Sequence, residues 1–491
     1  MMKRLERCAA LTLPKVMLPE GIDVENMDMT LDYQSFGAQA TNHLTNKLAM
    51  AMFSPIRPFL KVQPSAEALA RLLREEGLEE TDVLGALGEV ERKAMRRLDA
   101  SQQRHKLYGL LRRLLVTGNV LLDSSKKDRL RVMGLRQFVV KRTIEGELHT
   151  LCIQEKLCFD ELEDEVQELL DHKYQPESEV SYYKLIERQS NGSYKMWQAV
   201  DSSVLPQKFD GRWPADKLPY HVITWDLGDE DDYGTGLIEE YLGAFEAISI
   251  LSEGIANGGT LAAEFRWVLN GTGQTAIDDF RNSRNGDVIP GNKGDLEVVT
   301  PGNAESIRVL MDVKQQYERA VGAAFLMQSA VTRDAERVTA EEIRLLAMEL
   351  EGAHGGTFSN LASQLQTPVG KWLLVGIDAS VEGQDLELVI VTGLDGMSRN
   401  GEIENLKLAL QDLAIVNTLP PQVQQRLKWK EFTAFIGAGR GVDLSPFLKT
   451  EDEVAEEQAE AQQQQAQLEG QTAAATAAGE AVGMEAAGAP Q

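Results

Sequence analysis

The chain is poor in cysteine and histidine, and it lacks long apolar runs. Its three cysteines, Cys8, Cys152 and Cys158, include no close pair with metal-ligand or redox spacing, which argues against a disulfide framework or a zinc site. No segment approaches the ~18 unbroken apolar residues of a membrane helix. The basic and then apolar N-terminus is interrupted by Pro14 and Lys15, so we expect no signal peptide. These absences favour an assembly inside a cell, with no metal, no cofactor and no membrane association.

Sequence motifs for catalysis are also missing. The phosphate-binding pattern G-x-x-x-x-G-K-[ST] of an ATPase is absent, and so are H-E-x-x-H and G-x-S-x-G. The six histidines form no metal-binding pattern. Carboxylates are abundant enough that a chance pair could resemble a hydrolase site. The sequence nevertheless predicts a protein that is not an enzyme.

Positive charge is scarce, with 50 Lys and Arg against 76 Asp and Glu and a net charge of -26. Residues 451–491 hold nine acidic residues and no Lys or Arg, so about -17 of this charge belongs to the rest of the chain. Such a protein binds DNA poorly, because affinity comes mainly from cations that neutralise phosphates. On charge alone, the acidity indicates no more than a surface that keeps the protein soluble.

Apolar periodicity predicts a helical N-terminal module followed by a β-rich layer. The expected helices cover 35–53, 66–75 and 81–116. The expected strands cover 120–122, 138–142, 148–153, 182–187 and 194–200. Further helical spacing returns at 401–416 and 422–435, after strand-like residues from Trp372 to Val391.

Two long helices enclose a small β unit in the middle of the chain. The first is expected from 236 to Gly258-Gly259, and the second from 304 to 327. Between them, 265–269 and 296–299 read as strands separated by glycine-rich turns. Periodicity alone fits an ordinary helical hairpin with a decorated tip.

A charged segment, 328–338, follows the second long helix. It places Arg333 and Arg337 beside Asp334 and Glu336, between two apolar helical patterns. The next helix should begin with a capping box, in which the Thr339 hydroxyl and the Glu342 carboxylate satisfy each other's backbone N–H groups. Its apolar stripe contains Gly352, Gly355 and Gly356, each costing about 1 kcal/mol relative to Ala in a helix, so we expect a kink there.

Blocks of residues in a fixed order resemble the portal (head-to-tail connector) proteins of short-tailed, podovirus-type tailed phages. The blocks are Asp32-Tyr33-Gln34, Gly118-Asn119-Val120-Leu121-Leu122, Tyr233-Gly234, Ile238-Glu239-Glu240-Tyr241-Leu242-Gly243, Ser329-Ala330-Val331, Val338-Thr339-Ala340-Glu341-Glu342-Ile343-Arg344 and Thr392-Gly393-Leu394. Each block alone is weak, and their common order from Asp32 to Gly396 makes the resemblance specific.

The resemblance implies an α+β fold, the mainly helical phage portal fold, which assembles as a ring around a central channel. Its parts would be a helical and β-rich wing (1–235), a first stem helix (236–259), a clip (260–303), a second stem helix (304–327), a channel loop (328–338), a kinked tunnel helix (339–371), a β closure of the wing (372–400), a crown (401–469) and a low-complexity, disordered tail (470–491).

The resemblance also implies a function at the capsid portal vertex of the virion, after assembly in the host cytoplasm. Identical subunits, usually twelve, would form a ring through which double-stranded DNA is packaged by the terminase and later ejected, without sequence preference. Major capsid, scaffolding and tail adaptor proteins would be its other partners. The alternative is a soluble enzyme or scaffold protein with a helix-rich body, which would remain a monomer.

The resemblance also implies a DNA-channel loop, which would contain Gln328, Thr332, Arg333 and Arg337. A cation at ~4 Å from a phosphate gains only about 1 kcal/mol in water-like surroundings, which allows a moving duplex to be released. The other interpretation of the arginines is a surface ion-pair cluster with Asp334, Glu336 or Glu341, worth about 0 to 1 kcal/mol per pair.

Overall fold

The structure is a computed structural model of the whole chain, which divides into two compact units at residues 1–395 and 396–491. It describes residues 1–22, 32–54, 58–64, 80–170, 174–264, 266–273, 275–299, 304–327, 340–354, 356–377 and 386–390, with a few single positions between 411 and 439. The predicted helix 66–75, the crown region 401–469 but for those positions, and the tail 470–491 therefore lie outside the described residues.

Helices build the N-terminal part of the first unit. They are α1 (Met2–Leu11), α2 (Phe36–Met52), α4 (Glu80–Ala100) and α5 (Gln103–Thr117). Leu44 and Leu48 of α2 and Leu107, Leu111 and Leu114 of α5 are all fully or almost fully buried, as their helical spacing predicts. The single helix expected over 81–116 is wrong in one respect, because the chain breaks at Gln102, whose φ of 54° is left-handed.

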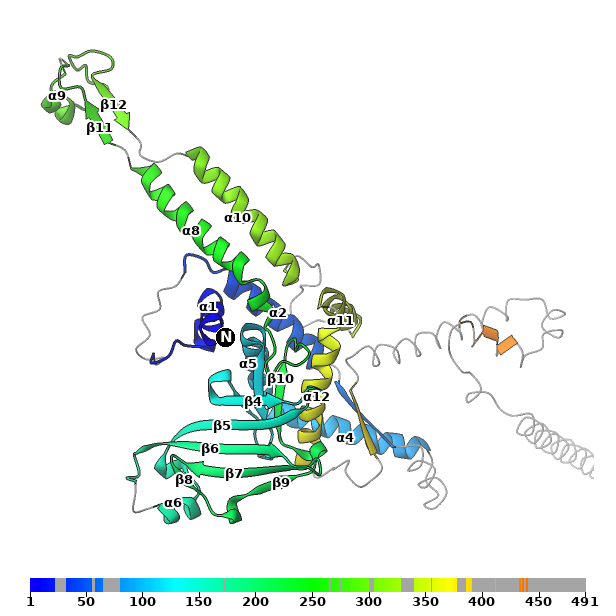
Figure 1. Cartoon of the computed structure of the whole chain (residues 1–491). Coiled ribbons are helices and arrows are strands. Elements are labelled where there is room, and N and C mark those ends of the chain that lie inside the picture. The colour runs from blue at the N-terminus through cyan, green and yellow to red at the C-terminus, as the bar shows by residue number, and fades with distance from the viewer. Residues whose placement is uncertain are drawn as a thin grey trace, which may run out of the picture. The chain divides into compact units, whose positions relative to one another are not determined.

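Antiparallel sheets follow these helices (Figure 1). The larger sheet has the path β4-β5-β6-β7-β8, with β9 paired to β7, and a three-stranded sheet has the order β10-β2-β3. The strands of the larger sheet are β4 (Phe138–Arg142), β5 (Leu148–Cys158), β6 (Glu179–Arg188), β7 (Tyr194–Val200), β8 (Ser203–Val204) and β9 (Gly211–Trp213). The smaller sheet contains β2 (Asn119–Asp123), β3 (Arg131–Met133) and β10 (Tyr220–Thr224), and α6 (Asp164–Leu170) covers one end of the larger one.

Two long helices project from this body side by side, with a small β unit at their far end (Figure 1). After the short α7 (Leu237–Glu240), α8 (Leu242–Ala263) runs outward and α10 (Ala304–Ala324) returns. Between them, β11 (Arg266–Leu269) pairs with β12 (Leu296–Val299), and α9 (Ile277–Asn282) packs the Phe280 ring against Trp267. The order of helix, β unit and helix is the predicted one.

Four predicted boundaries are wrong. The first long helix does not begin at 236 but at Leu242, because the chain leaves helical geometry at Tyr241, after the short α7. It does not stop at Gly258-Gly259 but continues to Ala263, because Gly258 packs against the Ile307 side chain of α10 and this contact offsets the low helix propensity of glycine. The second ends at Ala324 rather than at 327. The chain is not strand-like from Trp372, since α12 (Thr357–Gly376) extends the buried helical stripe through Val369, Trp372 and Leu373.

The last described elements are α11 (Ala340–His354), α12 and β13 (Leu386–Ile390). β13 pairs antiparallel with β1 (Leu60–Pro64), so a strand from the C-terminal side of α12 completes a sheet with the N-terminal part of the chain.

A junction of glycines joins α5 and β2 to the base of the long helices. Gly118 has a φ of 69°, and a Cβ at this position would lie 2.5 Å from the Gly236 nitrogen and 2.6 Å from the Gly234 oxygen. The buried Asn119 side chain donates to the Gly234 carbonyl at 2.7 Å and accepts from the Gly234 N–H at 2.8 Å. The backbones therefore approach as closely as glycine allows, and this fixes the point from which α7 and α8 start.

We expect Gly118→Ala to lower stability by several kcal/mol, because the new Cβ meets backbone atoms and the residue must keep a positive φ. Urea unfolding of the purified protein measures the effect. Gly109→Ala in the same α5 helix has nothing within 4 Å of the new Cβ, and should stabilise by about 0.5 to 1 kcal/mol. Equal effects of the two substitutions would contradict the close-approach argument.

Candidate functional site

The predicted channel-loop residues are not placed by the structure. Gln328, Thr332, Arg333 and Arg337 lie outside the described residues, as does Thr339, so the capping box stays a prediction. Glu342 lies in the first turn of α11, of which the backbone alone is described. The helices on both sides of the segment show how its two ends are held.

The predicted kink coincides with an interruption between α11 and α12. Gly352 lies within α11 with open space around it, Gly355 lies outside the described residues, and Gly356 has a left-handed φ of 90° just before α12 begins. The Glu351 carboxylate accepts the Ser359 N–H at 3.0 Å and so satisfies an orphan donor of the α12 N-terminus. The expected helix over 339–371 is therefore two helices, and the second extends to Gly376.

The end of α10 carries a Schellman cap with an unusual residue. The Met327 N–H donates to the Gly322 carbonyl at 2.7 Å and the Leu326 N–H to the Ala323 carbonyl at 3.1 Å, the two bonds that define this motif. Leu326 takes the left-handed position with a φ of 55°, where glycine is usual, at a cost of about 1 to 2 kcal/mol. The surroundings must therefore stabilise this turn.

Two side chains of α2 bind the Leu326 carbonyl. The Lys47 ammonium donates to it at 3.0 Å, and the His43 ring, one turn earlier, contacts it through Nε2 at 3.0 Å. Because a carbonyl can only accept, Nε2 of His43 must carry the proton. Burial lowers the pKa of His43, which favours the neutral ring, although the bond to Leu326 opposes the shift.

Lys47 also reaches the helix that follows the charged segment. Its ammonium lies 3.4 Å from the carboxylate of Glu349 in α11, and its side chain is almost completely buried. One cation on α2 thus contacts residues on both sides of the segment, Leu326 before it and Glu349 after it. The sequence contained one signal of this contact, since Lys47 lies on the apolar stripe between Leu44 and Leu48. A buried lysine is nearly always paired, so a partner could be expected.

Aromatic packing also stabilises the turn at the end of α10. The Phe325 ring is fully buried, with its centroid 5.7 Å from that of Phe245 and 5.9 Å from that of Tyr241. Both partners lie at the start of α8, so the base of α8 and the end of α10 share one core. We call Lys47, His43, Leu326 and Glu349 the loop anchor.

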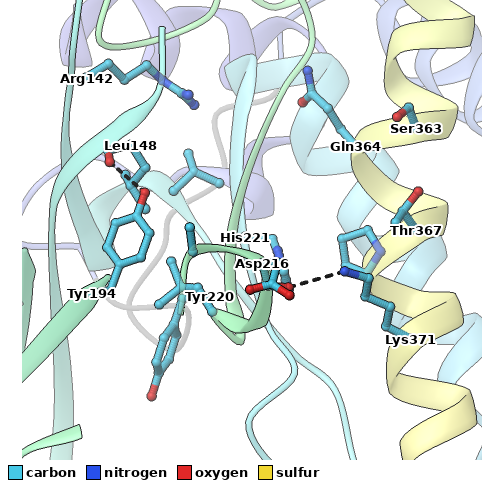
Figure 2. Close-up of a pocket in the computed structure, with 14 residues that line it drawn as sticks. Arg142, Leu148, Tyr194, Asp216, Tyr220, His221, Ser363, Gln364, Thr367 and Lys371 are labelled. Atoms are coloured by element: carbon cyan, nitrogen blue, oxygen red, sulfur yellow. Dashed lines mark hydrogen bonds between the residues drawn. The ribbon is translucent and has the colours of Figure 1, made fainter. Parts of the chain in front are cut away.

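A second feature is an open groove of about 390 Å³ between β10 and α12 (Figure 2). Ser363, Thr367 and Lys371 line it from α12, and Arg142 and Tyr194 from the larger sheet. The Lys371 ammonium donates to the Asp216 carbonyl at 3.2 Å, and the Tyr194 hydroxyl donates to the Leu148 carbonyl at 2.8 Å.

The charges of the groove are partly compensated. Asp232 accepts the Arg142 backbone N–H at 2.6 Å, and burial lowers the pKa of Arg142 against the opposing effect of the Asp232 charge. Burial, with a smaller contribution from Lys371, lowers the pKa of His221 to about 4, so this ring is neutral near pH 7. The described residues that line the groove offer cations and hydroxyl donors.

The part of the chain that the structure describes contains no group of three or more His, Cys, Asp or Glu side chains that could hold a metal ion. In the same residues, no helix is both long and apolar enough to cross a membrane.

We expect Lys47→Met to lower stability by about 2 to 4 kcal/mol, because the Leu326 carbonyl loses a charged donor and Glu349 loses its partner. Urea unfolding of Lys47→Met, Glu349→Gln and the double variant measures the coupling. A double variant as destabilised as the sum of the single ones would contradict a shared anchor. Lys61→Met, at an exposed position of β1, is the control and should change little.

Comparisons with known proteins agree with this architecture. A family model described as bacteriophage head to tail connecting protein matches residues 1–448. The portal protein of Enterobacteria phage SP6 is 32% identical over 459 residues, covering 92% of this chain and 88% of the relative. Those of Pseudomonas phage phiKMV and Escherichia phage T7 are 31% and 28% identical, covering 87% and 92% of this chain and 85% of each relative. The chain belongs to the family of bacteriophage head-to-tail connecting proteins.

Proposed function

We propose that copies of this chain form a ring around a central channel at the capsid portal vertex, with twelve subunits as the resemblance implies. Membership in the connector family and the similarity to portal proteins over most of the chain support this function. The stem helices, α8 and α10, supply the physical argument, because a single chain leaves part of their apolar surface in water.

The observation that carries the proposal is the composition of α8. Its 22 residues include two charged ones, Glu246 and Glu253, while its buried residues are confined to Phe245, Ile248, Ser249 and Ser252. A helix that is apolar on nearly all sides is normally covered on nearly all sides.

Large apolar side chains on both stem helices are exposed in the single chain. Ile250 of α8 is 67% exposed, and Val309 and Met311 of α10 are 60% and 54% exposed. Burial of such side chains contributes about 25 cal/mol per Å² of apolar area, so packing between neighbouring stems favours assembly. In a ring, one face of each copy packs against a different face of the next copy, which is a heterologous contact.

We expect Ile250→Glu combined with Met311→Glu to prevent ring formation, because a charge placed in an apolar contact must be desolvated. Size-exclusion chromatography and negative-stain images of the purified chain report the outcome. Ile144→Glu, in the turn between β4 and β5 where the side chain is 85% exposed, is the matched control and should leave rings intact. A wild-type protein that stays monomeric at micromolar concentration would refute the ring.

The second part of the proposal concerns DNA. Double-stranded DNA would pass through the channel, driven by the terminase during packaging, and touch segment 328–338 without sequence preference. Arg333 and Arg337 become rings of cations by rotational symmetry, while Asp334 and Glu336 balance them locally. Such contacts touch phosphates without holding them. The loop anchor supports this role, because it holds Leu326, two residues before the segment, and Glu349 in the helix that follows the segment.

Deletion of residues 328–338 should leave rings intact and impair the packaging or retention of DNA, because Leu326 and Glu349 keep their contacts with Lys47. Complementation of a portal-deficient phage, with capsid DNA content as the readout, measures this. Substituting Arg333 and Arg337 by Gln at full length separates the effect of charge from that of loop length. Failure of the deletion variant to form rings would show that the segment is an assembly element.

The remaining partners follow from the same proposal. Tail adaptor proteins would attach to the ring after packaging, and major capsid and scaffolding proteins would surround it during assembly in the host cytoplasm. We assign no catalysis to the chain. In this proposal, the energy for DNA movement therefore comes from the terminase.

A further inference from the structure

A group of cations surrounds the C-terminal end of α12, in a chain whose net charge is -26. Figure 1 shows this end of α12 beside α4. The loop between β2 and β3 contributes Lys126, Lys127 and Arg129, α4 contributes Arg97, and α12 contributes Lys371. We call these five residues the basic surface.

Specific contacts bring the members of the basic surface together. The Trp372 indole N–H donates to the Lys126 carbonyl at 2.8 Å, and the Arg97 guanidinium lies 4.7 Å from the centre of the Trp372 ring. Arg97 also donates to the Lys127 carbonyl. These bonds hold the backbone of the loop against α12, and the Lys126 and Arg129 side chains of the loop are exposed.

Lys371 extends the surface to the groove of Figure 2, where it binds the Asp216 carbonyl. Ser124, at the start of the same loop, donates through its backbone and its hydroxyl to Pro219, three residues beyond Asp216. The loop, η5 (Ala215–Lys217) and α12 therefore form one continuous surface, and the hydroxyl groups of Ser363 and Thr367 lie along α12 toward its other end.

Three of the cations have no carboxylate partner among the residues that the structure describes. Within the described ranges, Lys126, Arg129 and Lys371 form no ion pair with an acidic side chain, and all three side chains are exposed. Asp128 and Asp216 are the acidic residues beside them in sequence, and both are exposed. At an ionic strength of about 0.1 M, repulsion from acids more than ~10 Å away is largely screened, so the local cations determine what binds here.

We propose that the basic surface binds the phosphate backbone of double-stranded DNA at a site separate from segment 328–338. Exposed lysine, arginine and hydroxyl groups are those that contact phosphates without reading sequence. An acidic protein is a less suitable occupant, because protein interfaces are centred on exposed aromatic or aliphatic anchors. Trp372 is the aromatic residue of the basic surface region, and its ring is buried and so cannot serve as such an anchor. Since Lys371 lies 15 residues after Gly356 along α12, this site lies about 22 Å from Gly356.

The inference rests on the proposed function, which brings DNA to the ring. It adds a second contact, on the body of the subunit rather than on the channel loop. Lys126, Arg129 and Lys371 lie on exposed loops and on the outer side of a helix, where their removal leaves the core unchanged. Their effect on DNA binding can therefore be measured in assembled protein.

The test compares full-length rings carrying Lys126→Gln, Arg129→Gln and Lys371→Gln with rings carrying Lys3→Gln, Lys15→Gln and Lys61→Gln, three exposed lysines elsewhere. Fluorescence anisotropy with a short mixed-sequence duplex, over a range of salt concentrations, gives the affinity and its salt slope. We expect the first triple variant to bind about ten-fold or more weakly, with a slope lower by about 2.7, or 0.9 per lost phosphate contact. The control triple variant, with the same net charge, should bind like the wild type.

Two outcomes would overturn the proposal. Equal weakening by both triple variants would show that overall charge, and not this surface, governs binding. Loss of affinity for a polyglutamate peptide with unchanged affinity for the duplex would assign the surface to an acidic protein partner. Negative-stain images of the same samples report ring formation independently, so a failure of the proposed assembly is distinguishable from a failure of this site.

Discussion

A single buried ammonium group on α2 joins the helices on both sides of segment 328–338. Lys47 binds the carbonyl of Leu326 at the end of α10 and the carboxylate of Glu349 in α11. Burying a charge is costly unless it is paired and hydrogen-bonded, so both partners must stay in place once α2 is packed. Leu326 and Glu349, which lie before and after segment 328–338, are thereby coupled to the helical core.

The strained turn at Leu326 is stabilised by this interaction. A leucine in the left-handed conformation is tolerated because its carbonyl faces two donors, His43 and Lys47, and because Phe325 beside it is locked among the rings of Tyr241 and Phe245. The base of the stem is therefore rigid on both sides: by the loop anchor at the end of α10, and by the Gly118 and Asn119 junction at the start of α7. A fixed base suits the packing between neighbouring copies that we propose for the exposed apolar faces of α8 and α10.

Much of the local structure followed from pattern. β4, β7 and β12 occupy the predicted residues, because strict alternation or short apolar runs bounded by turns leave little freedom. The errors occurred where tertiary contacts outweigh local preference, as at Gly258 against Ile307 and at Trp372 beneath Arg97. The candidate loop residues, Arg333 and Arg337, could be named from sequence, but their contacts lie outside the described residues. The loop anchor was missed, because sequence spacing does not show that Lys47 meets a carbonyl 279 residues away.

The sequence by itself determined the family, through blocks of residues that occur in the order typical of portal proteins. It also determined the succession of helical body, β layer, long helix, β unit and long helix, and the acidity that makes a group of exposed cations unusual. Tertiary structure alone decided which polar groups share a site. Lys47 and Glu349, or Lys126 and Lys371, are far apart in sequence and follow no spacing rule. Hydrogen bonds and ion pairs act over a few ångströms, so they exist only after folding has brought their partners together.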